Sequence, residues 1–373
     1  MKPLRCLILI VVAARCAGPA VGADAEKLKD KSFVAVVQER FDKWSREKTL
    51  TAAAVVKLIA KASAHGDEAA ALVAIHRHQH AHADCAVTKE FLLRPAKSGA
   101  DAAHLEGDFQ AARKRIASAT RELFVGHAPT LKAIHQGDRS DCFFLASVGA
   151  AIHSNPQRIR RLFQIHDDGS FDVVFSEQHK EHVARLTDAQ IGLVADEDDR
   201  AEGIWLTALE LAMGRRINQA LHTAIKHGKG KEMLSLDRIG GGGDPSKIMA
   251  QLTGHHIVGL EVEPAATAKI REAAKTAHTY LACLTIGKFK AAPPPGMIAG
   301  HCYAIIGYDA QKDAFQIWNP HGNNHKPKGP PGLANGYPTD DGHFSMPLRD
   351  LLASVKGTVC HETNQPMSKD DRP

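Results

Sequence analysis

The chain has 373 residues, of which 44% are hydrophobic and 24% are charged, and its formal net charge is +5 at pH 7. This is the composition of a globular protein, long enough for two or three compact units. Basic and acidic residues are interspersed without a dense basic patch, so we expect no nucleic-acid partner.

Residues 1–22 predict a secretory signal peptide of the bacterial type. A basic start precedes an apolar core at 7–14 and small residues at 19–23. The core is too short for a membrane anchor and is followed by Arg15, which also disfavours lipid attachment at Cys16. We therefore expect a secreted or periplasmic protein with no membrane contact after cleavage, a formal charge of about +2, and a monomeric state.

Residues 23–125 form an Ala-rich region with helical spacing of apolar residues. We interpret it as a helical domain packed on the rest of the chain; a pro-segment or a docking segment is the alternative. The stretch 41–51 faintly resembles an EF-hand entry but lacks the central Gly and most ligands. The alternating histidines of 76–82 would place His78 and His82 on one helix face, but no third metal ligand is fixed there, so a solvated helix end is the simpler interpretation.

A buried helix is predicted to begin at a cysteine near the middle of the chain. A polar loop ends at Asp141, and an apolar run continues from Cys142 to Ile152 before Pro156. Ser140 or Asp141 would cap this helix. Cys142 would then meet unpaired backbone N–H groups and the positive end of the helix dipole, which lower a thiol pKa and favour a nucleophile. The alternative is a small buried hydrophobe.

The second half of the chain is predicted to be rich in β-strands. The strand-like segments are 257–262, 280–286, 300–309, 314–320 and 343–346. His301 lies at the start of one strand and Asn319 at the end of the next, so an antiparallel pair would bring them together. A thiolate needs a base, and the base needs a third group to fix its ring; Cys142, His301 and Asn319 in this order are the papain-type solution.

Four segments together resemble the catalytic core of the calpain family of cysteine proteases. Residues 136–147 resemble its nucleophile motif, a Gln six residues before a Gly-Asp-Cys-Trp-Phe-Leu run, and 204–212 resemble its Trp…Leu-Glu-Lys-Ala helix. Residues 300–304 with 318–322 resemble its Gly-His-Ala-Tyr and Asn-Pro-Trp-Gly motifs, and 340–346 resemble Asp-Asp-Gly-Glu-Phe-Trp-Met. The resemblance spans roughly 125–362, in the family's order.

The resemblance implies an α+β, papain-like fold and a cysteine endopeptidase acting on proteins or peptides. Cys142 would be the nucleophile, His301 the acid/base and Asn319 the orienting amide, while Gln136 and the Cys142 backbone N–H would form the oxyanion hole. Three residues depart from the family pattern. Ser140 replaces Gly, Phe143 replaces Trp, and His321 replaces the Trp that shields the His–Asn pair.

Calcium is the one cofactor that the resemblance suggests, and it would have to bind in the core because no additional calcium-binding domain is seen. The acidic run 196–199 would be the contact, although a solvated loop is the simpler interpretation. The glycines at 240–243 match a Gly pair beside the family's substrate cleft, where a peptide backbone could approach closely. A flexible connector is nearly as good an explanation.

These segments predict an order along the chain. The signal peptide at 1–22 and the helical region at 23–125 precede a catalytic domain at 126–362, and a flexible tail follows at 363–373. Within the catalytic domain the helical half runs to about 240 and the β half starts at about 255.

Five cysteines remain after signal cleavage, so at least one thiol stays unpaired in an oxidising compartment. Two other functions fit the same residues. One is a transglutaminase-like acyl transferase, a family that uses Asp where this chain has Asn319. The other is a catalytically inactive relative that binds peptides or partners.

Overall fold

The computed structural model describes residues 70, 73, 99–126, 128–137, 139–176, 179–194, 202–226 and 235–367. The chain divides into two compact units, Met1–Ala119 with Leu186–Ala195, and Thr120–Arg185 with Asp196–Pro373. The four candidate site residues all belong to the larger unit. Several predicted features lie outside the described residues: the signal peptide, the EF-hand-like stretch, the histidines of 76–82, Cys85 and the acidic run 196–199.

The smaller unit contains α6 (Gly99–Ser118) and α9 (Asp188–Leu193). Thr187 and Gln190 form a capping box at the start of α9. The Gln190 backbone N–H donates to the Thr187 hydroxyl oxygen, and the Thr187 backbone N–H donates to Oε1 of the Gln190 side chain. A Cβ at Gly192 would lie 3.0 Å from Ile116, so the two helices pack closely there. The sequence alone assigned 186–195 to the catalytic region, because nothing local in this segment reveals its packing against α6.

The helical half of the larger unit is built around α7 (Cys142–Ser154), whose residues from Phe143 to Ile152 are all buried. Its start and its apolar run are as predicted. The other helices of this half are α8 (Gln157–Arg161), α10 (Trp205–Lys226), α11 (Ser235–Gly240) and α12 (Pro245–Thr253). The Asp244 carboxylate caps α12 by accepting from the Ser246 N–H at 2.9 Å, and Gly254 ends the helix at φ 76°.

A small antiparallel sheet in the same unit has the order β1-β2-β3. Its strands are β1 (Phe163–Ile165), β2 (Phe171–Val174) and β3 (Lys180–Val183). β1 and β3 are three and four residues long, too short for an alternating pattern to stand out.

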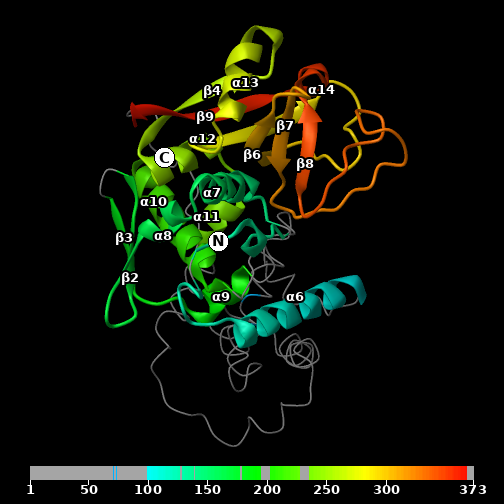
Figure 1. Cartoon of the computed structure of the whole chain (residues 1–373). Coiled ribbons are helices and arrows are strands. Elements are labelled where there is room, and N and C mark those ends of the chain that lie inside the picture. The colour runs from blue at the N-terminus through cyan, green and yellow to red at the C-terminus, as the bar shows by residue number, and fades with distance from the viewer. Residues whose placement is uncertain are drawn as a thin grey trace, which may run out of the picture. The chain divides into compact units, whose positions relative to one another are not determined.

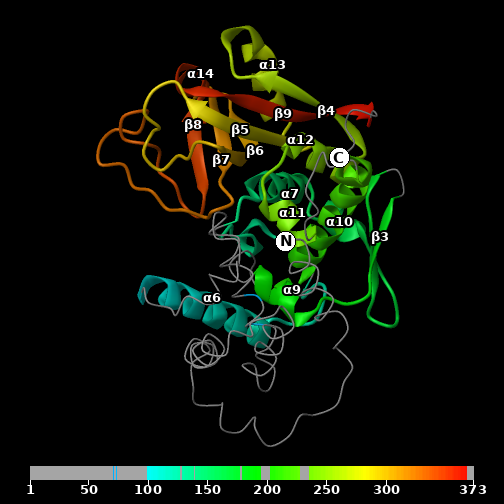
Figure 2. The same cartoon turned by 180° about the vertical axis from the view of Figure 1, so that it is seen from behind.

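The β half is a six-stranded antiparallel sheet with the order β4-β9-β5-β6-β7-β8 (Figures 1 and 2). Its strands are β4 (His255–Glu261), β5 (Ala282–Phe289), β6 (His301–Asp309), β7 (Ala314–Trp318), β8 (His343–Pro347) and β9 (Val355–Pro366). Five were predicted, and β9 was not. β9 lies between β4 and β5 and includes residues 363–366, which the sequence assigned to a flexible tail.

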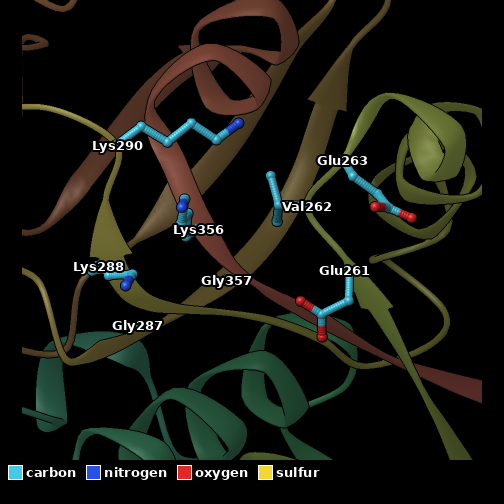
Figure 3. Close-up of a pocket in the computed structure, with 8 residues that line it drawn as sticks. All are labelled: Glu261, Val262, Glu263, Gly287, Lys288, Lys290, Lys356 and Gly357. Atoms are coloured by element: carbon cyan, nitrogen blue, oxygen red, sulfur yellow. The ribbon is translucent and has the colours of Figure 1, made fainter.

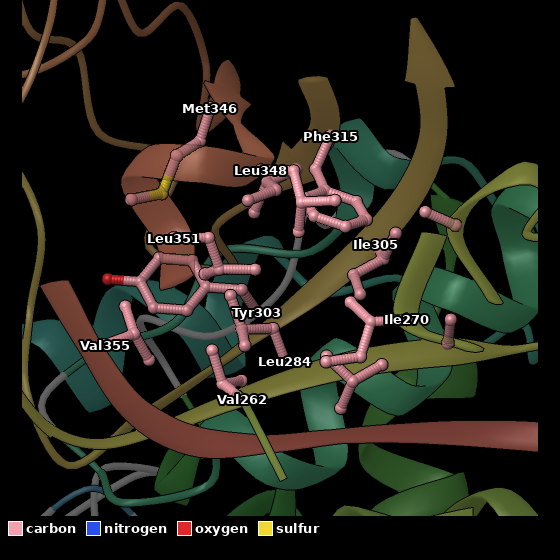
Figure 4. Close-up of a cluster of buried hydrophobic side chains, with 14 of the residues drawn as sticks. Val262, Ile270, Leu284, Tyr303, Ile305, Phe315, Met346, Leu348, Leu351 and Val355 are labelled. Atoms are coloured by element: carbon pink, nitrogen blue, oxygen red, sulfur yellow. The ribbon is translucent and has the colours of Figure 1, made fainter. Parts of the chain in front are cut away.

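The core of the β half lies on one face of this sheet, under α13 (Thr267–Lys275) and α14 (Leu348–Ser354) (Figure 4). Alternate residues such as Leu284, Tyr303 and Ile305 point into this core. The residues between them, including Cys283 and Cys302, point to the opposite face, and the Ser147 hydroxyl of α7 lies 4.0 Å from the Cys283 sulfur. The sheet thus has the nucleophile helix on one side and its own core on the other.

Among the described residues, no helix is both long enough and apolar enough to cross a membrane.

Candidate active site

Cys142 is the first residue of α7 and is half-buried. Asp141 occupies the N-cap position, and its backbone carbonyl accepts from the N–H groups of Phe144 and Leu145 at 2.9 and 3.0 Å. The predicted side-chain cap is absent: no hydrogen bond runs from the Asp141 carboxylate to the helix N-terminus. The carboxylate instead lies 3.8 Å from Nε of Arg139, so it takes part in an ionic cluster behind the nucleophile.

That cluster fixes the loop leading to Cys142. The Arg139 guanidinium donates to the Leu236 carbonyl at 2.5 Å and lies 3.4 Å from the carboxylate of Glu210, which is fully buried on α10. The guanidinium packs closely against Gly240, where a Cβ would lie 2.6 Å from Nε of Arg139. The Ser140 N–H donates to the Gly240 carbonyl at 3.1 Å, so the glycine run lies beside the nucleophile loop.

His301 and Asn319 are brought together by strand register, as predicted. β6 begins at His301, β7 ends at Trp318, and Ala304 pairs with Trp318. His301 Nε2–H donates to Asn319 Oδ1 at 2.8 Å. Because Nε2 carries the proton of this bond, Nδ1 is the basic nitrogen of the neutral ring.

The Asn319 amide is held in the orientation that this bond requires. Its Nδ2 donates to Asn323 Oδ1 at 2.7 Å, and its Oδ1 also accepts from the His321 backbone N–H at 3.1 Å. The Asn319 backbone N–H donates to the Gly342 carbonyl at 2.9 Å. Both ends of the amide group are therefore fixed, and Oδ1 faces the imidazole.

A close contact joins α7 to β7, the strand that ends one residue before Asn319. A Cβ at Gly149 of α7 would lie 2.4 Å from the ring of Trp318, which is buried beside it. Only a residue without a side chain lets the indole lie this close to the helix backbone. The contact sets the spacing between α7 and β7, and with it the spacing between Cys142 and Asn319.

The Cys142 sulfur lies at the start of β6, where the backbone of Cys302 hydrogen-bonds to it. The pKa of the Cys142 thiol is nevertheless raised to about 11, chiefly by burial and also by the neighbouring Cys302 and Asp141. The sequence predicted the opposite direction from the position at the helix N-terminus. That expectation is wrong because the loss of solvation and the Asp141 charge outweigh the backbone donors.

Burial lowers the pKa of His301 to about 4; the bond to Asn319 opposes this shift, and the nearby His321 adds to it. With its pKa raised, the Cys142 thiol is neutral at physiological pH, and with its pKa lowered, the His301 imidazole is neutral as well.

Gln136 and His321 tie the nucleophile loop to the turn after Asn319. The Gln136 backbone N–H donates to the Pro320 carbonyl at 2.8 Å, and His321 Nδ1–H donates to the Gln136 carbonyl at 3.2 Å. The Gln136 side chain is buried, and its Nε2 donates to the Arg139 carbonyl at 2.7 Å. An amide nitrogen carries two N–H bonds, so this contact fixes the group and leaves a second donor.

The imidazole of His321 stacks on that of His301, with ring centroids 4.9 Å apart and planes 13° apart. The ring of Tyr303 packs against the His301 imidazole in a T-shaped arrangement, with ring centroids 4.7 Å apart. His301 is only 3% exposed as a result. The ring of His321 therefore covers the His–Asn pair at the position where the resemblance expects Trp.

Residues 101–330 match the sequence model of the calpain family cysteine proteases, and this range contains Gln136, Cys142, His301 and Asn319. The chain belongs to the calpain family of cysteine proteases. The match covers most of the chain's length, and the observed α+β architecture agrees with a papain-like core. The segment 340–346 lies beyond the matched range. No curated protein matches the chain.

Calcium is the cofactor that the resemblance to the family suggests. The ion prefers six to eight oxygen ligands. Among the described residues, the cluster of three potential ligands is His166, Asp172 and His182, which offers two nitrogens and one carboxylate. This donor set does not fit calcium, and no catalytic step here passes through the ion.

The described cysteines Cys142, Cys283, Cys302 and Cys360 are all free thiols.

A groove elsewhere on the β half is lined by charged residues (Figure 3). Figure 3 shows Lys288, Lys290 and Lys356 on one side and Glu261 with Glu263 on the other. None of the four candidate site residues lines it, so the chemistry belongs elsewhere.

Sequence reasoning missed the residues that support the site. Asn323, Tyr303 and Gly149 act through contacts with residues distant in sequence or on another strand, which no local pattern reveals. Arg139 was missed as well, since two of its partners, Glu210 and the Leu236 carbonyl, are distant in sequence.

Proposed function

We propose that this calpain family protease is an endopeptidase that hydrolyses peptide bonds through Cys142, His301 and Asn319. The observation that carries the proposal is the His301–Asn319 bond of 2.8 Å. It is buried under His321 and lies on the strand whose Cys302 backbone contacts the Cys142 sulfur.

The catalytic cycle would begin when a peptide carbonyl is bound beside Cys142. The sulfur attacks the carbonyl carbon while His301 Nδ1 takes the thiol proton, and the carbonyl oxygen becomes an oxyanion. The Cys142 backbone N–H and the second N–H of the Gln136 amide would stabilise that charge. His301 then gives the proton to the leaving amine, and an acyl-enzyme remains.

Deacylation would repeat the sequence with water. Neutral His301 takes a proton from water as the oxygen attacks the thioester, and the proton returns to the Cys142 sulfur as it leaves. Asn319 holds the ring through both steps and stabilises the imidazolium by accepting from Nε2–H.

Two assays test this proposal: casein turnover and incorporation of a labelled primary amine. Each is measured with wild type, and Cys142→Ala is the control. The proposal expects peptide-bond hydrolysis that disappears in Cys142→Ala. Incorporation of amine in preference to hydrolysis would favour the acyl transferase. No turnover of any substrate by the folded wild type would favour the inactive, peptide-binding relative.

Two further parts of the proposal concern the protein's surroundings. The pattern of residues 1–22 supports export, so the mature chain should begin after that segment when the protein is recovered from the medium or the periplasm. Calcium dependence would rest on the acidic run 196–199. Casein turnover that survives EDTA would separate this protease from calcium-dependent relatives, and turnover restored by added calcium would support dependence.

A further inference from the structure

We propose that His166, Asp172 and His182 form a binding site for a divalent transition-metal ion, best matched by zinc, on the small three-stranded sheet. One ligand atom from each of the three residues lies within 4.8 Å of the other two. The site is separate from the catalytic residues, which lie on α7 and the six-stranded sheet, and does not depend on the proposed proteolysis.

The strand register explains why the three side chains converge. Asp172 of β2 pairs directly with His182 of β3, so their side chains lie on one face of the sheet. His166 follows the end of β1, and a turn brings the chain back into β2: the Gly169 N–H donates to the His166 carbonyl, and the His166 N–H donates to the Ser170 carbonyl. Each of the three strands or their ends thus supplies one side chain.

The separations fit a tetrahedral zinc site. His166 Nε2 lies 3.3 Å from Asp172 Oδ1, and His182 Nδ1 lies 2.8 Å from the same oxygen. Zinc–nitrogen and zinc–oxygen bonds of about 2.0–2.2 Å at tetrahedral angles place neighbouring ligand atoms about 3.3 Å apart. The first separation matches this value, and a small rotation of the exposed His182 ring would bring the second to it.

The donor set selects among metals. Two imidazole nitrogens and one carboxylate are typical of zinc and related ions, whereas calcium and magnesium prefer oxygen alone. Three protein ligands leave a fourth position for water. His166 and His182 are exposed and Asp172 is partly exposed, so an ion from solution can reach all three.

Other charged groups around the cluster bear on its affinity. Lys180 Nζ lies 3.8 Å from the second oxygen of Asp172 and would oppose a cation, but it is half-exposed and also donates to Gln164 at 2.8 Å. Asp168, two residues after His166, accepts from the Ser170 N–H at 2.9 Å and from its hydroxyl at 2.6 Å, so a second carboxylate is held in the turn that follows β1.

The bound ion would join all three strands of the sheet. β1 and β3 are short, and the metal would add a covalent-like link between them through β2. We therefore expect zinc to raise the melting temperature of the protein without being needed for the chemistry at Cys142.

The test uses the full-length exported chain carrying Cys142→Ala, which removes the catalytic thiol as a competing zinc ligand. EDTA-stripped protein is titrated with zinc by calorimetry and with cobalt by visible absorption. His166→Gln and His182→Gln are each made in this background. The matched control is His179→Gln, because His179 Nε2 lies 2.6 Å from Glu181 in the same sheet but lacks a third ligand among the described residues.

The Cys142→Ala protein and its His179→Gln variant should each bind one more equivalent of zinc than the His166→Gln or His182→Gln variant. The visible absorption of tetrahedral cobalt should be lost in His166→Gln and in His182→Gln. It expects zinc affinity at this site to fall at least about 100-fold on loss of either imidazole. Both histidines are exposed, so both variants should fold, which circular dichroism checks. Zinc stoichiometry and affinity unchanged in His166→Gln and His182→Gln would overturn the proposal, as would calcium binding there in place of zinc.

Discussion

The two halves of the candidate site are held in place by different physical means. The nucleophile loop of the helical half is anchored by buried charges, the Arg139 guanidinium between Asp141 and Glu210. The His301–Asn319 pair of the β half is positioned by strand register and by bonds between neutral groups. Burial is the largest cause of both pKa shifts, so the thiol of the first half stays protonated and the imidazole of the second half stays unprotonated.

Breaking the neutral half should have the largest effect on catalysis. Asn319→Ala removes the acceptor that fixes the ring and tautomer of His301, and we expect kcat/KM to fall about 10²–10⁴-fold. Peptide turnover measures this loss. Asn364→Ala, on an exposed part of β9, is the control and should leave turnover unchanged. An Asn319→Ala enzyme within a few-fold of wild type would show that register alone positions His301.

Breaking the charged half should instead appear first as lost stability. Arg139→Leu removes the guanidinium that both buried carboxylates face, at a cost of about 3 kcal/mol in the free energy of unfolding. Urea denaturation measures the cost. Arg349→Leu is the control, because Arg349 is 86% exposed, and its effect should stay below about 0.5 kcal/mol. Equal free energies of unfolding for Arg139→Leu and Arg349→Leu would show that the ionic cluster does not stabilise the protein.

The contact between the halves offers a third perturbation. In Gly149→Ala, the new methyl group would overlap Trp318, and we expect a loss of about 1–3 kcal/mol together with reduced turnover as α7 moves away from β7. Gly107→Ala is a matched control in α6, where nothing lies within 4 Å of the added Cβ. Helix propensity should make that control neutral or slightly stabilising. A Gly149→Ala protein as active and stable as wild type would contradict the spacing role.

The pH dependence sharpens the comparison. His301 must be neutral to accept the thiol proton, so kcat/KM should fall as pH drops through about 4. The same lowered pKa affects folding: the unfolded chain takes up a proton near 6.5, before the native ring does. This contribution to stability is intact above pH 6.5 and is lost between 6.5 and about 4, by up to about 3 kcal/mol.

His301→Gln should remove that loss and flatten the acid side of the stability curve. Burial also lowers the pKa of His153 and His361, so a smaller acid-dependent loss should remain. If acid destabilises His301→Gln as much as it destabilises wild type, the buried neutral imidazole is not its cause.

The smallest effect should come from the stacked ring. His321→Phe keeps an aromatic cover on His301 but removes an imidazole that lowers its pKa. The acid limb of kcat/KM should therefore move up, by less than about one pH unit, because burial is the larger cause. His278→Phe, at an exposed position, should not move it. A shift to lower pH in His321→Phe would reverse the assigned role.

Much of this arrangement could be predicted from residue order. The start of β6 at His301, the end of β7 beside Asn319 and the start of α7 at Cys142 followed from local patterns. Strand periodicity and helix boundaries are set by neighbouring residues, which explains this success.

The remaining features depend on tertiary packing. The thiol pKa was predicted in the wrong direction because burial of Cys142 and the position of the Asp141 carboxylate cannot be seen in the sequence. β9 was missed although it lies between two predicted strands, since its burial alternates poorly along its length. The stacking of His321 on His301 likewise depends on how one turn folds over a strand.

The most direct test of the account is to map which cysteine reacts with an epoxide inhibitor of thiol proteases. The described residues include free thiols at Cys142, Cys283, Cys302 and Cys360, and of these four only Cys142 is not buried. Mass spectrometry should find one label, on Cys142, and the label should disappear in His301→Ala while the folded state persists. Labelling of another cysteine, or undiminished labelling of Cys142 in His301→Ala, would contradict the claim that the two halves meet in one reacting pair.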